Sequence, residues 1–174
     1  MEETEQLLSG GILGLTAGTI PLTCRRDFAQ ATLEILRQTQ REVQIYTPDL
    51  EAALYDREEV IAELRRILLR RRERSVHIVV EKIATARSYD HRIIPLLHQF
   101  SDRIALRRPL PEQENRPFGF LIADLDGYIY RRHPDNYQGE ADFHQRSRAN
   151  QLSRQFSEIW ERAEPERGVR QLYL

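Results

Sequence analysis

Apolar and polar positions follow two different periods along the chain, one typical of strands and one typical of helices. Alternating or continuous apolar runs predict strands over 19–24, 41–47, 76–80, 103–107, 118–123 and 128–130, with a further edge strand over 169–174. Apolar residues spaced by three and four predict helices over 27–36, 57–74, 86–100 and 142–163, and a helical turn over 50–55. Strands that alternate with helices are typical of α/β proteins.

The stretch from Arg116 to Arg132 contains the strongest local signal. Phe118 to Ala123 is almost entirely apolar, as expected of a strand buried on both faces. Asp126-Gly127 separates it from the β-prone residues Tyr128–Tyr130, and Asp-Gly between two such segments predicts a two-residue hairpin turn. We therefore expect a central Asp-Gly hairpin in a mixed, mostly parallel sheet flanked by helices. Residues 1–17 carry three glycines and predict a loose N-terminal arm, and residues 18–174 predict one α/β domain.

Composition limits the classes of protein that this chain fits. Its 174 residues are 40% hydrophobic and 30% charged, the balance of a globular domain. No apolar run approaches the roughly 18–20 residues that span a bilayer, and the acidic start lacks the basic region of a signal peptide. A single cysteine, Cys24, excludes an internal disulfide. These features predict a cytoplasmic protein without a membrane partner.

The charges are balanced in number but unusual in kind. The net charge of −1 argues against a nucleic-acid partner. Lys82 is the only lysine among 26 basic residues. Genomic base composition explains such a bias, and so does recognition of phosphate or carboxylate by arginine forks. Composition alone leaves both explanations open.

The order of elements resembles one half of the phospholipase D-like fold. The resemblance rests on Val43–Leu50, Val76–Val80 and Arg103–Arg107, on the strand ending in Asp124 with its hairpin, and on a closing helix with Phe156 and Trp160. It implies an ancestry among enzymes that carry H-x-K-x-x-x-x-D on this strand, in which histidine attacks phosphorus and lysine binds phosphate oxygens. The chain also resembles bacterial phospholipase D-like domains, some of which are appended to acetyltransferases of the GNAT type.

The catalytic motif of that family is missing here. When its aspartate is aligned with Asp124, Gly119 takes the lysine position and Pro117 takes the histidine position. Alignment on Asp126 instead places Leu121 at the lysine position and Gly119 at the histidine position. Proline cannot attack phosphorus, so the resemblance predicts that the family's chemistry is absent and that Asp124 caps or orients local backbone. Downstream, the family's small G-S-x-N element is replaced by Arg131, Arg132, His133 and Pro134, which either fill the pocket or form an anion cradle.

The histidines and glycines predict neither a metal site nor a cofactor. His91 and His98 are seven residues apart on one predicted helix, whereas helical metal ligands are spaced by three or four. The chain has no G-x-G-x-x-G and no P-loop. We therefore expect no metal and no cofactor.

A set of basic residues at predicted element ends forms the candidate binding site, together with Asp124. Its members are Arg107, Arg108, Arg131, Arg132, His133, Arg146 and, more peripherally, Arg148. Pairing with nearby acids at the surface is the competing explanation for the arginines.

Two functions are open at this stage. The first is a non-catalytic binding or regulatory domain for a small anion or for a protein such as an acyltransferase. The alternative is a phosphodiesterase or nuclease with a non-standard site around His133, Asp124 and His144, which requires the two histidines to lie close together. A homodimer is also predicted, because Tyr128, Tyr130, Tyr137 and Phe143 lie near the arginines. The same rings could instead cover the core of the hairpin.

Overall fold

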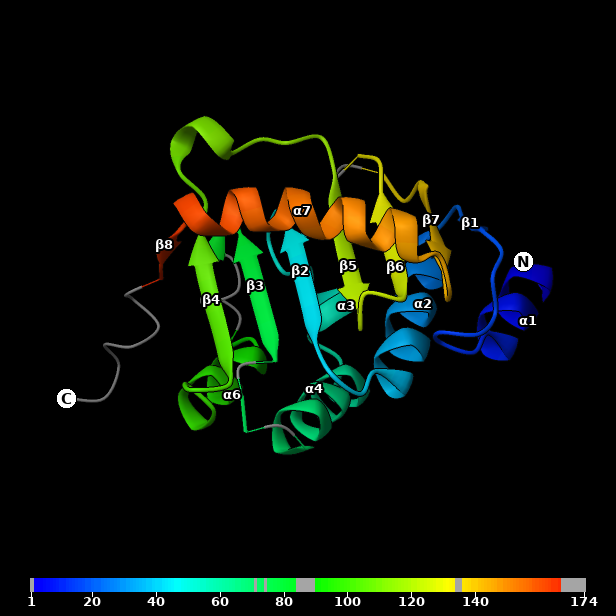
Figure 1. Ribbon diagram of the computed structural model, residues 1–174, viewed down its shortest axis with the longest axis horizontal. Coiled ribbons are helices and arrows are strands. Elements are labelled where there is room, and N and C mark those ends of the chain that lie inside the picture. The colour runs from blue at the N-terminus through cyan, green and yellow to red at the C-terminus, as the bar shows by residue number, and fades with distance from the viewer. Residues whose placement is uncertain (1, 71, 74, 84–89, 134–135, 167–174) are drawn as a thin grey trace.

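The computed structural model describes residues 2–70, 72–73, 75–83, 90–133 and 136–166. Its centre is an eight-stranded sheet in the order β1-β7-β6-β5-β2-β3-β4-β8 (Figure 1). The strands are β1 (Ile20–Leu22), β2 (Val43–Thr47), β3 (Val76–Val80), β4 (Ile104–Arg108), β5 (Gly119–Ala123), β6 (Gly127–Arg131), β7 (Gly139–Asp142) and β8 (Glu164–Pro165). The predicted α/β class and mixed sheet are confirmed.

The parallel share of the sheet is smaller than predicted. Within the described residues, only β2–β3 and β3–β4 pair in parallel, and the other neighbours are antiparallel. The reason is that β5, β6 and β7 follow one another through tight connections rather than helical crossovers, and such connections reverse the strand direction.

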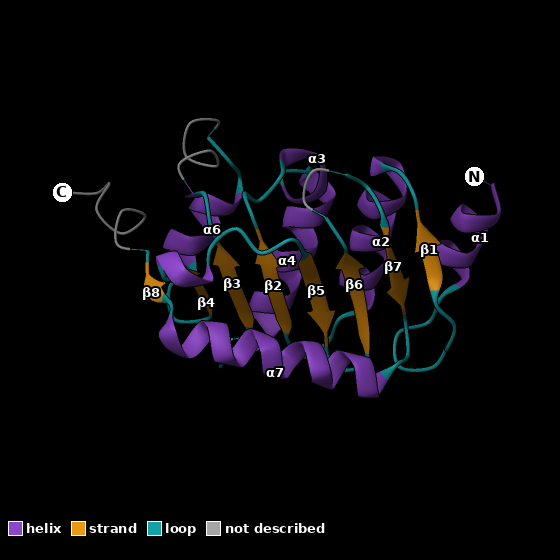
Figure 2. Ribbon diagram, turned by 90° about the horizontal axis from the view of Figure 1, so that it is seen from above, coloured by secondary structure: helices purple, strands orange, loops and turns teal. Residues whose placement is uncertain are grey.

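The helices form layers on both faces of the sheet. They are α1 (Glu2–Gly10), α2 (Arg25–Gln38), α3 (Ala52–Tyr55), α4 (Glu58–Arg70), α6 (Ile93–Gln99) and α7 (Arg146–Arg162), with a 3₁₀ turn at Pro111–Gln113. Figure 2 shows α7 alone along one face, opposite the layer that contains α2 and α4. The predicted helix over 86–100 falls partly, and the predicted strand over 169–174 wholly, outside the described residues.

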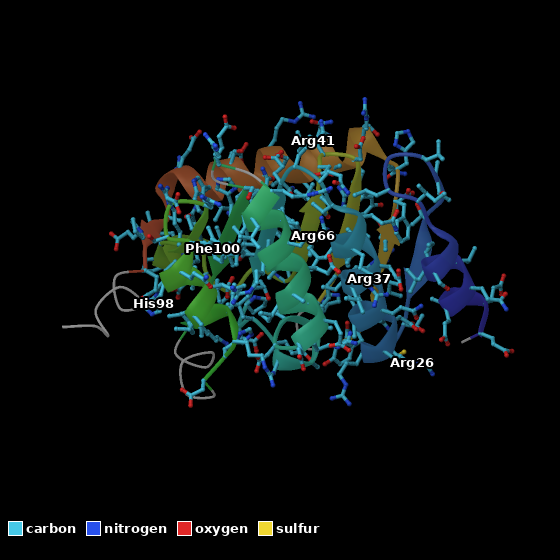
Figure 3. The ribbon with its side chains drawn as sticks, turned by 90° about the horizontal axis from the view of Figure 1, so that it is seen from below. Arg26, Arg37, Arg41, Arg66, His98 and Phe100 are labelled. Atoms are coloured by element: carbon cyan, nitrogen blue, oxygen red, sulfur yellow. The ribbon has the colours of Figure 1, made fainter. Side chains whose placement is uncertain are left out.

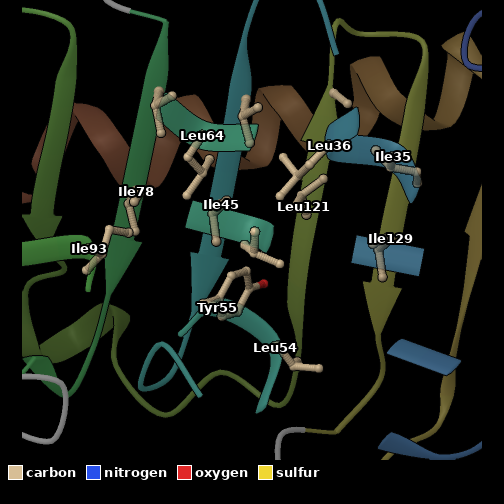
Figure 4. Close-up of a cluster of buried hydrophobic side chains, with 14 of the residues drawn as sticks. Ile35, Leu36, Ile45, Leu54, Tyr55, Leu64, Ile78, Ile93, Leu121 and Ile129 are labelled. Atoms are coloured by element: carbon tan, nitrogen blue, oxygen red, sulfur yellow. The ribbon is translucent and has the colours of Figure 1, made fainter. Parts of the chain in front are cut away.

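Each face of the sheet buries its own core. Ile45, Ile78 and Leu121 pack with α2, α3 and α4 on one face (Figure 4). Tyr46 and Phe120 point to the other face, where they pack with Phe156 and its neighbours on α7. Successive side chains of a strand point to opposite faces, so β2 and β5 contribute to both cores. These strands are consequently the buried centre of the molecule.

The end of α2 and the loop after it are held by an arginine of α4. The Arg66 guanidinium of α4 donates to the carbonyls of Leu36, Arg37 and Thr39 at 2.8, 3.0 and 3.0 Å, and Figure 3 shows Arg66 beside Arg37. These bonds satisfy carbonyls that the end of α2 leaves without helical partners. The direction in which the chain enters β2 is thereby fixed.

The first residues are not the loose arm that the glycines predicted. Residues 2–10 form α1, and Leu8 on this helix is fully buried. The amide of Leu13 donates to the Gln38 side chain at 2.8 Å, and Gln38 donates to the Gly11 carbonyl at 2.9 Å. One buried leucine and these bonds are enough to hold the segment against the domain.

The central hairpin is confirmed, but its turn lies earlier than predicted. Ala123 pairs with Gly127, and the amide of Asp126 donates to the Ala123 carbonyl at 3.0 Å. The turn residues are Asp124 and Leu125, with φ of 55° and 57°, the left-handed values of a type I′ turn. Gly127 is needed for another reason: a Cβ there would lie 2.9 Å from the Asp142 carbonyl oxygen.

Candidate functional site

The positions of the missing catalytic motif lie at the edge of the sheet where β2 and β3 end. Because β5 runs antiparallel to β2, its first residue, Gly119, lies beside the carboxyl ends of both parallel strands, at the upper edge in Figure 1. Pro117 lies two residues before it. Ligand sites of open α/β sheets commonly occur at this edge.

A cavity of about 370 Å³ opens at this edge and is the candidate site. Its walls come from the segments that follow β2, β3 and β6 and from the segment that precedes β5. We call it the upper cavity, and its lining residues are Pro48, Asp49, Glu51, Glu81, Lys82, Asn115, Arg116, Pro117, Arg131 and His133.

Glu81 organises the β3 side of the upper cavity. Its buried carboxylate accepts a hydrogen bond from the Tyr46 hydroxyl and from the amides of Asn115, at 3.1 Å, and Arg116, at 3.4 Å. Burial and the neighbouring Glu81 carboxylate raise the pKa of Tyr46 above its usual value, so the phenol keeps its proton. Glu81 thus fixes the loop that carries Pro117 and is already occupied by protein donors.

Arg131 and Glu51 organise the β6 side. The guanidinium of Arg131 contacts Glu51 Oε2 at 2.8 Å and lies 4.5 Å from the ring centre of Tyr137. The Tyr137 hydroxyl donates to the other oxygen of Glu51. Only 13% of the Arg131 side chain is exposed, so this arginine stabilises the wall of the cavity while its charge is balanced by Glu51.

Lys82 and Arg116 are differently placed. Within the part of the chain that the structure describes, no carboxylate forms an ion pair with either side chain. The backbone amide of Lys82 donates to the Pro48 carbonyl at 2.7 Å, and Arg116 Nε donates to the Gln113 carbonyl at 3.3 Å. The Lys82 side chain is exposed and that of Arg116 is half-buried. Both cations are therefore available to a ligand.

Asp49 is a half-buried carboxyl group in the lining of the upper cavity. Burial and the nearby Glu51 raise the pKa of Asp49, while Arg131 and Lys82 act in the opposite direction. His133 completes the lining as an exposed side chain two residues beyond the end of β6. The cavity thus contains cations, carboxyl groups and an imidazole.

The replaced positions suit the packing of this chain. A Cβ at position 119 would lie 3.2 Å from the Tyr46 carbonyl oxygen and 3.7 Å from Pro48 Cδ, closer than most side chains approach backbone. A lysine there would need β5 to shift away from β2. Glycine at this position therefore allows the two strands to pair closely.

The predicted basic residues do not converge on one site. Arg131 and His133 line the upper cavity, but Arg107 lies 4.3 Å above the Trp160 ring and donates to the Trp160 carbonyl at 2.7 Å. The remaining arginines pair with acids or pack on rings: Arg108 with Glu114 at 3.1 Å, Arg132 with Glu140 at 3.6 Å, Arg146 with Asp126 at 2.6 Å, and Arg148 over Tyr130 at 5.0 Å. Pairing with nearby acids was the competing explanation, and it describes Arg108, Arg132 and Arg146.

Asp124 lies at the opposite end of β5 from Pro117. Its carboxylate accepts hydrogen bonds from the amides of three consecutive residues, Gln40 to Glu42, at 2.7–2.9 Å. The prediction that it caps local backbone is confirmed. It borders a second cavity of about 410 Å³ between the start of β2 and the start of α7, which also contains Arg146.

His133 and His144 do not form one site. His133 follows β6, whereas His144 follows β7 and lies 4.0 Å from Asp126 in the hairpin turn. Because β6 and β7 are antiparallel, the two histidines lie at opposite ends of the strand pair. The predicted constellation of His133, Asp124 and His144 is therefore wrong. Tyr128 and Phe143 are buried, so these two rings cover the core rather than a surface.

Sequence reasoning missed most of the upper cavity. The missed residues come from three separate loops, and no spacing in the chain connects these loops. They are Asp49, Glu51, Glu81, Lys82 and Arg116. Two signals pointed there without being combined. Pro117 stood at the nucleophile position of the resembling family, and Lys82 was the only lysine.

Two solved structures resemble this chain in fold over most of its length. TrmBL2, an archaeal chromatin protein described as showing a novel mode of DNA binding, has a TM-score of 0.62 and 17% identity over 94% of this chain and 60% of its own. Phosphatidylserine synthase from Haemophilus influenzae has a TM-score of 0.62 and 13% identity over 90% of this chain and 41% of its own. This chain thus spans less than two thirds of either protein.

A third similar structure is nearer in length. Nuc from Salmonella typhimurium, a member of the phospholipase D family, has a TM-score of 0.54 and 12% identity over 77% of this chain and 87% of its own. At these identities the likeness concerns the fold alone. The fold is phospholipase D-like, as the order of elements predicted.

Sequence comparison assigns the family. No curated protein matches the chain. No helix among the described residues has the length and apolar character needed to cross a membrane. Residues 24–172 match the model of a family described as a domain of unknown function, DUF7931, and since they make up most of the chain, this protein belongs to that family.

Proposed function

We propose that this chain is a non-catalytic binding domain whose upper cavity takes a small anion. The observation that carries the proposal is the pair of cations, Lys82 and Arg116, that line an open cavity without a carboxylate partner among the described residues. Two such groups at one cavity recognise phosphate or carboxylate through charge-assisted hydrogen bonds. Pro117, at the nucleophile position of the phospholipase D-like enzymes that the chain resembles, supports binding without turnover.

Calorimetric titration with inorganic phosphate and with succinate at low ionic strength tests the proposal. Lys82→Gln and Arg116→Gln should each weaken binding about tenfold, since each removes a hydrogen bond to a charged group. Arg154→Gln is the matched control, because it removes one exposed charge on α7 outside the cavity. If neither anion binds, or if all three variants lose the same amount of affinity, the proposal is contradicted.

A second function, hydrolysis of phosphodiesters, is favoured by one observation. His133, Lys82 and Asp49 line the same cavity, although they come from three different strand ends. His133 could attack phosphorus, Lys82 could bind a phosphate oxygen, and a protonated Asp49 could give its proton to the departing alkoxide. Water would then release the phosphoryl group from His133.

The two functions differ in turnover. We expect purified protein to leave bis-p-nitrophenyl phosphate and DNA intact without added metal, because Pro117 stands at the nucleophile position of the phospholipase D-like enzymes that the chain resembles. Release of p-nitrophenol that is abolished in His133→Ala would instead establish the second function. Turnover that persists in His133→Ala would indicate a contaminating enzyme.

A further inference from the structure

The two sides of the upper cavity carry opposite charge. On the β3 side, Lys82 and Arg116 lie beside one carboxylate, Glu81, to which the Arg116 backbone is hydrogen-bonded. The formal charge of this side is therefore +1. Glu81 is occupied by the Tyr46 hydroxyl and by two amides, so it does not neutralise both cations.

On the β6 side the imbalance is reversed. Asp49 and Glu51 lie two residues apart and share one described cation, Arg131, which is in contact with Glu51 at 2.8 Å. The formal charge of this side is −1. No ion pair within 4.0 Å joins Asp49 to Lys82 or Arg116 in the described residues, although Lys82 lies near enough to oppose the rise in the pKa of Asp49. The excess charges of the two sides are therefore not in direct contact.

From this arrangement, and resting on the proposed anion-binding function, we infer that the ligand is a small zwitterion. Its anionic group is held by Lys82 and Arg116, and its ammonium group by Asp49. An anion alone would leave Asp49, which accepts a hydrogen bond from the Glu51 backbone, without a cation in ion-pair contact among the described residues, and an amine alone would leave the two cations without an anion. A cavity of about 370 Å³ is at the small end of ligand sites, which suits a molecule of this class.

The electrostatics of Asp49 agree with this assignment. Burial and the nearby Glu51 raise the pKa of Asp49, so this environment favours the protonated carboxyl more than bulk water does. A ligand ammonium would supply the missing positive charge and favour the carboxylate. Amino acids and aminoalkyl phosphonates share the required chemistry, and their anionic groups distinguish the two sources.

A series of matched ligands tests the inference by calorimetry on the full chain. The probes are γ-aminobutyrate, butyrate and butylamine, with 3-aminopropylphosphonate and propylphosphonate as the phosphorus counterparts. We expect each zwitterion to bind at least about tenfold more tightly than the matched anion, and butylamine to bind weakest. Glycine and β-alanine then report which separation of charges fits the cavity.

Variants connect the preference to named side chains. Asp49→Asn should reduce the affinity for the zwitterion to that for the matched anion, whereas Lys82→Gln should weaken both. Arg154→Gln should change neither. Thermal unfolding of each variant shows whether it remains folded. If Asp49→Asn does not fold, the ligand series on the unaltered chain still tests the inference.

The outcomes separate this inference from the proposed function. If anions and zwitterions bind equally well, the zwitterion is excluded while anion binding stands. If no probe binds, both are wrong. A preference for the zwitterion that survives in Asp49→Asn would also overturn the inference, because the ammonium would then be held elsewhere.

Discussion

The Asp124 carboxylate and the backbone amide of Arg41 are joined by a hydrogen bond of 2.7 Å that links the central hairpin to the entry of β2. The amides of Gln40 and Glu42 donate to the same carboxylate at 2.8 and 2.9 Å. Three consecutive amides that would otherwise lack partners are thereby satisfied. In the resembling enzymes an aspartate stands at this position, and here it has a purely structural partner set.

Replacement of Asp124 should therefore destabilise the fold. We expect Asp124→Ala to lower the free energy of unfolding by about 3 kcal/mol, since three amides lose charge-assisted hydrogen bonds to a buried carboxylate. Asp124→Asn should cost less, because asparagine keeps one acceptor and tolerates the positive φ of 55°. Urea denaturation measures both. A loss below about 0.5 kcal/mol for Asp124→Ala would place it among ordinary surface substitutions and contradict this role.

The contrast between Val76–Val80 and Gly139–Asp142 shows how far the sequence predicted the fold. Val76–Val80 is a β-branched run and forms β3 over the predicted residues, because a strand with apolar residues on both faces is defined by its own composition. Gly139–Asp142 forms β7, which no pattern predicted: Ala141 is its one apolar residue, and pairing with β1 and β6 determines its conformation. Tertiary contacts decided this strand.

The same distinction holds for the candidate site. Asp124 was assigned a capping role from one strand-end position, and its three backbone donors are local to a single loop. Lys82 and Asp49 could not be paired in this way, since they are brought together only by the parallel pairing of β2 and β3. The pairing of Arg131 with Glu51 could not be predicted for a related reason, because Glu51 comes from a distant segment of the chain.

Gly139 should tolerate no side chain. A Cβ there would lie 2.0 Å from the Tyr130 carbonyl oxygen and 2.9 Å from Phe28 Cζ, so β7 would have to move off β6. We expect Gly139→Ala to lower the free energy of unfolding by roughly 2–3 kcal/mol. Gly10→Ala is the matched control: nothing lies within 4 Å of its Cβ at the end of α1, and alanine should be neutral or stabilising by up to about 1 kcal/mol. Equal stability of the two variants in urea would disprove the assigned register of β7.

His91 should make stability depend on pH. Its ring is 2% exposed; Nδ1 accepts the Ile93 amide at 3.1 Å, so the proton lies on Nε2, which donates to the Leu50 carbonyl at 3.1 Å. Burial lowers the pKa of His91 below the ordinary 6.5, against the opposing effect of Asp56 at 3.7 Å. The unfolded chain therefore takes up a proton at a higher pH than the folded chain does.

The sign of the effect follows from this order of protonation. The contribution of His91 is fully present above pH 6.5 and is lost as the pH falls toward the lowered folded-state pKa. We expect the unaltered protein to lose more stability than His91→Gln between pH 7.5 and 5.5, by at most about 1.4 kcal/mol per pH unit. Parallel pH dependence in the two proteins would show that other groups control acid sensitivity.

Assembly is the remaining prediction, and the structure changes the residues on which it rests. Tyr128 and Phe143 are interior, and Tyr137 packs against the core on the other face of the sheet from Phe118 and Tyr130. A two-fold interface beside the upper cavity would therefore use the half-buried rings of Phe118 and Tyr130 with the exposed Arg132. Phe118 and Tyr130 stack at 6.1 Å and form one continuous surface. A two-fold contact uses such a surface twice, which makes even a modest aromatic area sufficient.

Size-exclusion chromatography with light scattering at micromolar concentration measures the mass directly. We expect twice the monomer mass of 20.6 kDa. Tyr130→Ala and Arg132→Glu should each shift the protein toward the monomer, since the first removes an aromatic contact and the second reverses a charge beside it. Arg154→Glu, which reverses an exposed charge on α7 away from these rings, should leave the mass unchanged. A mass of 20.6 kDa for the unaltered chain would exclude the dimer, and equal dissociation by all three variants would place the interface elsewhere.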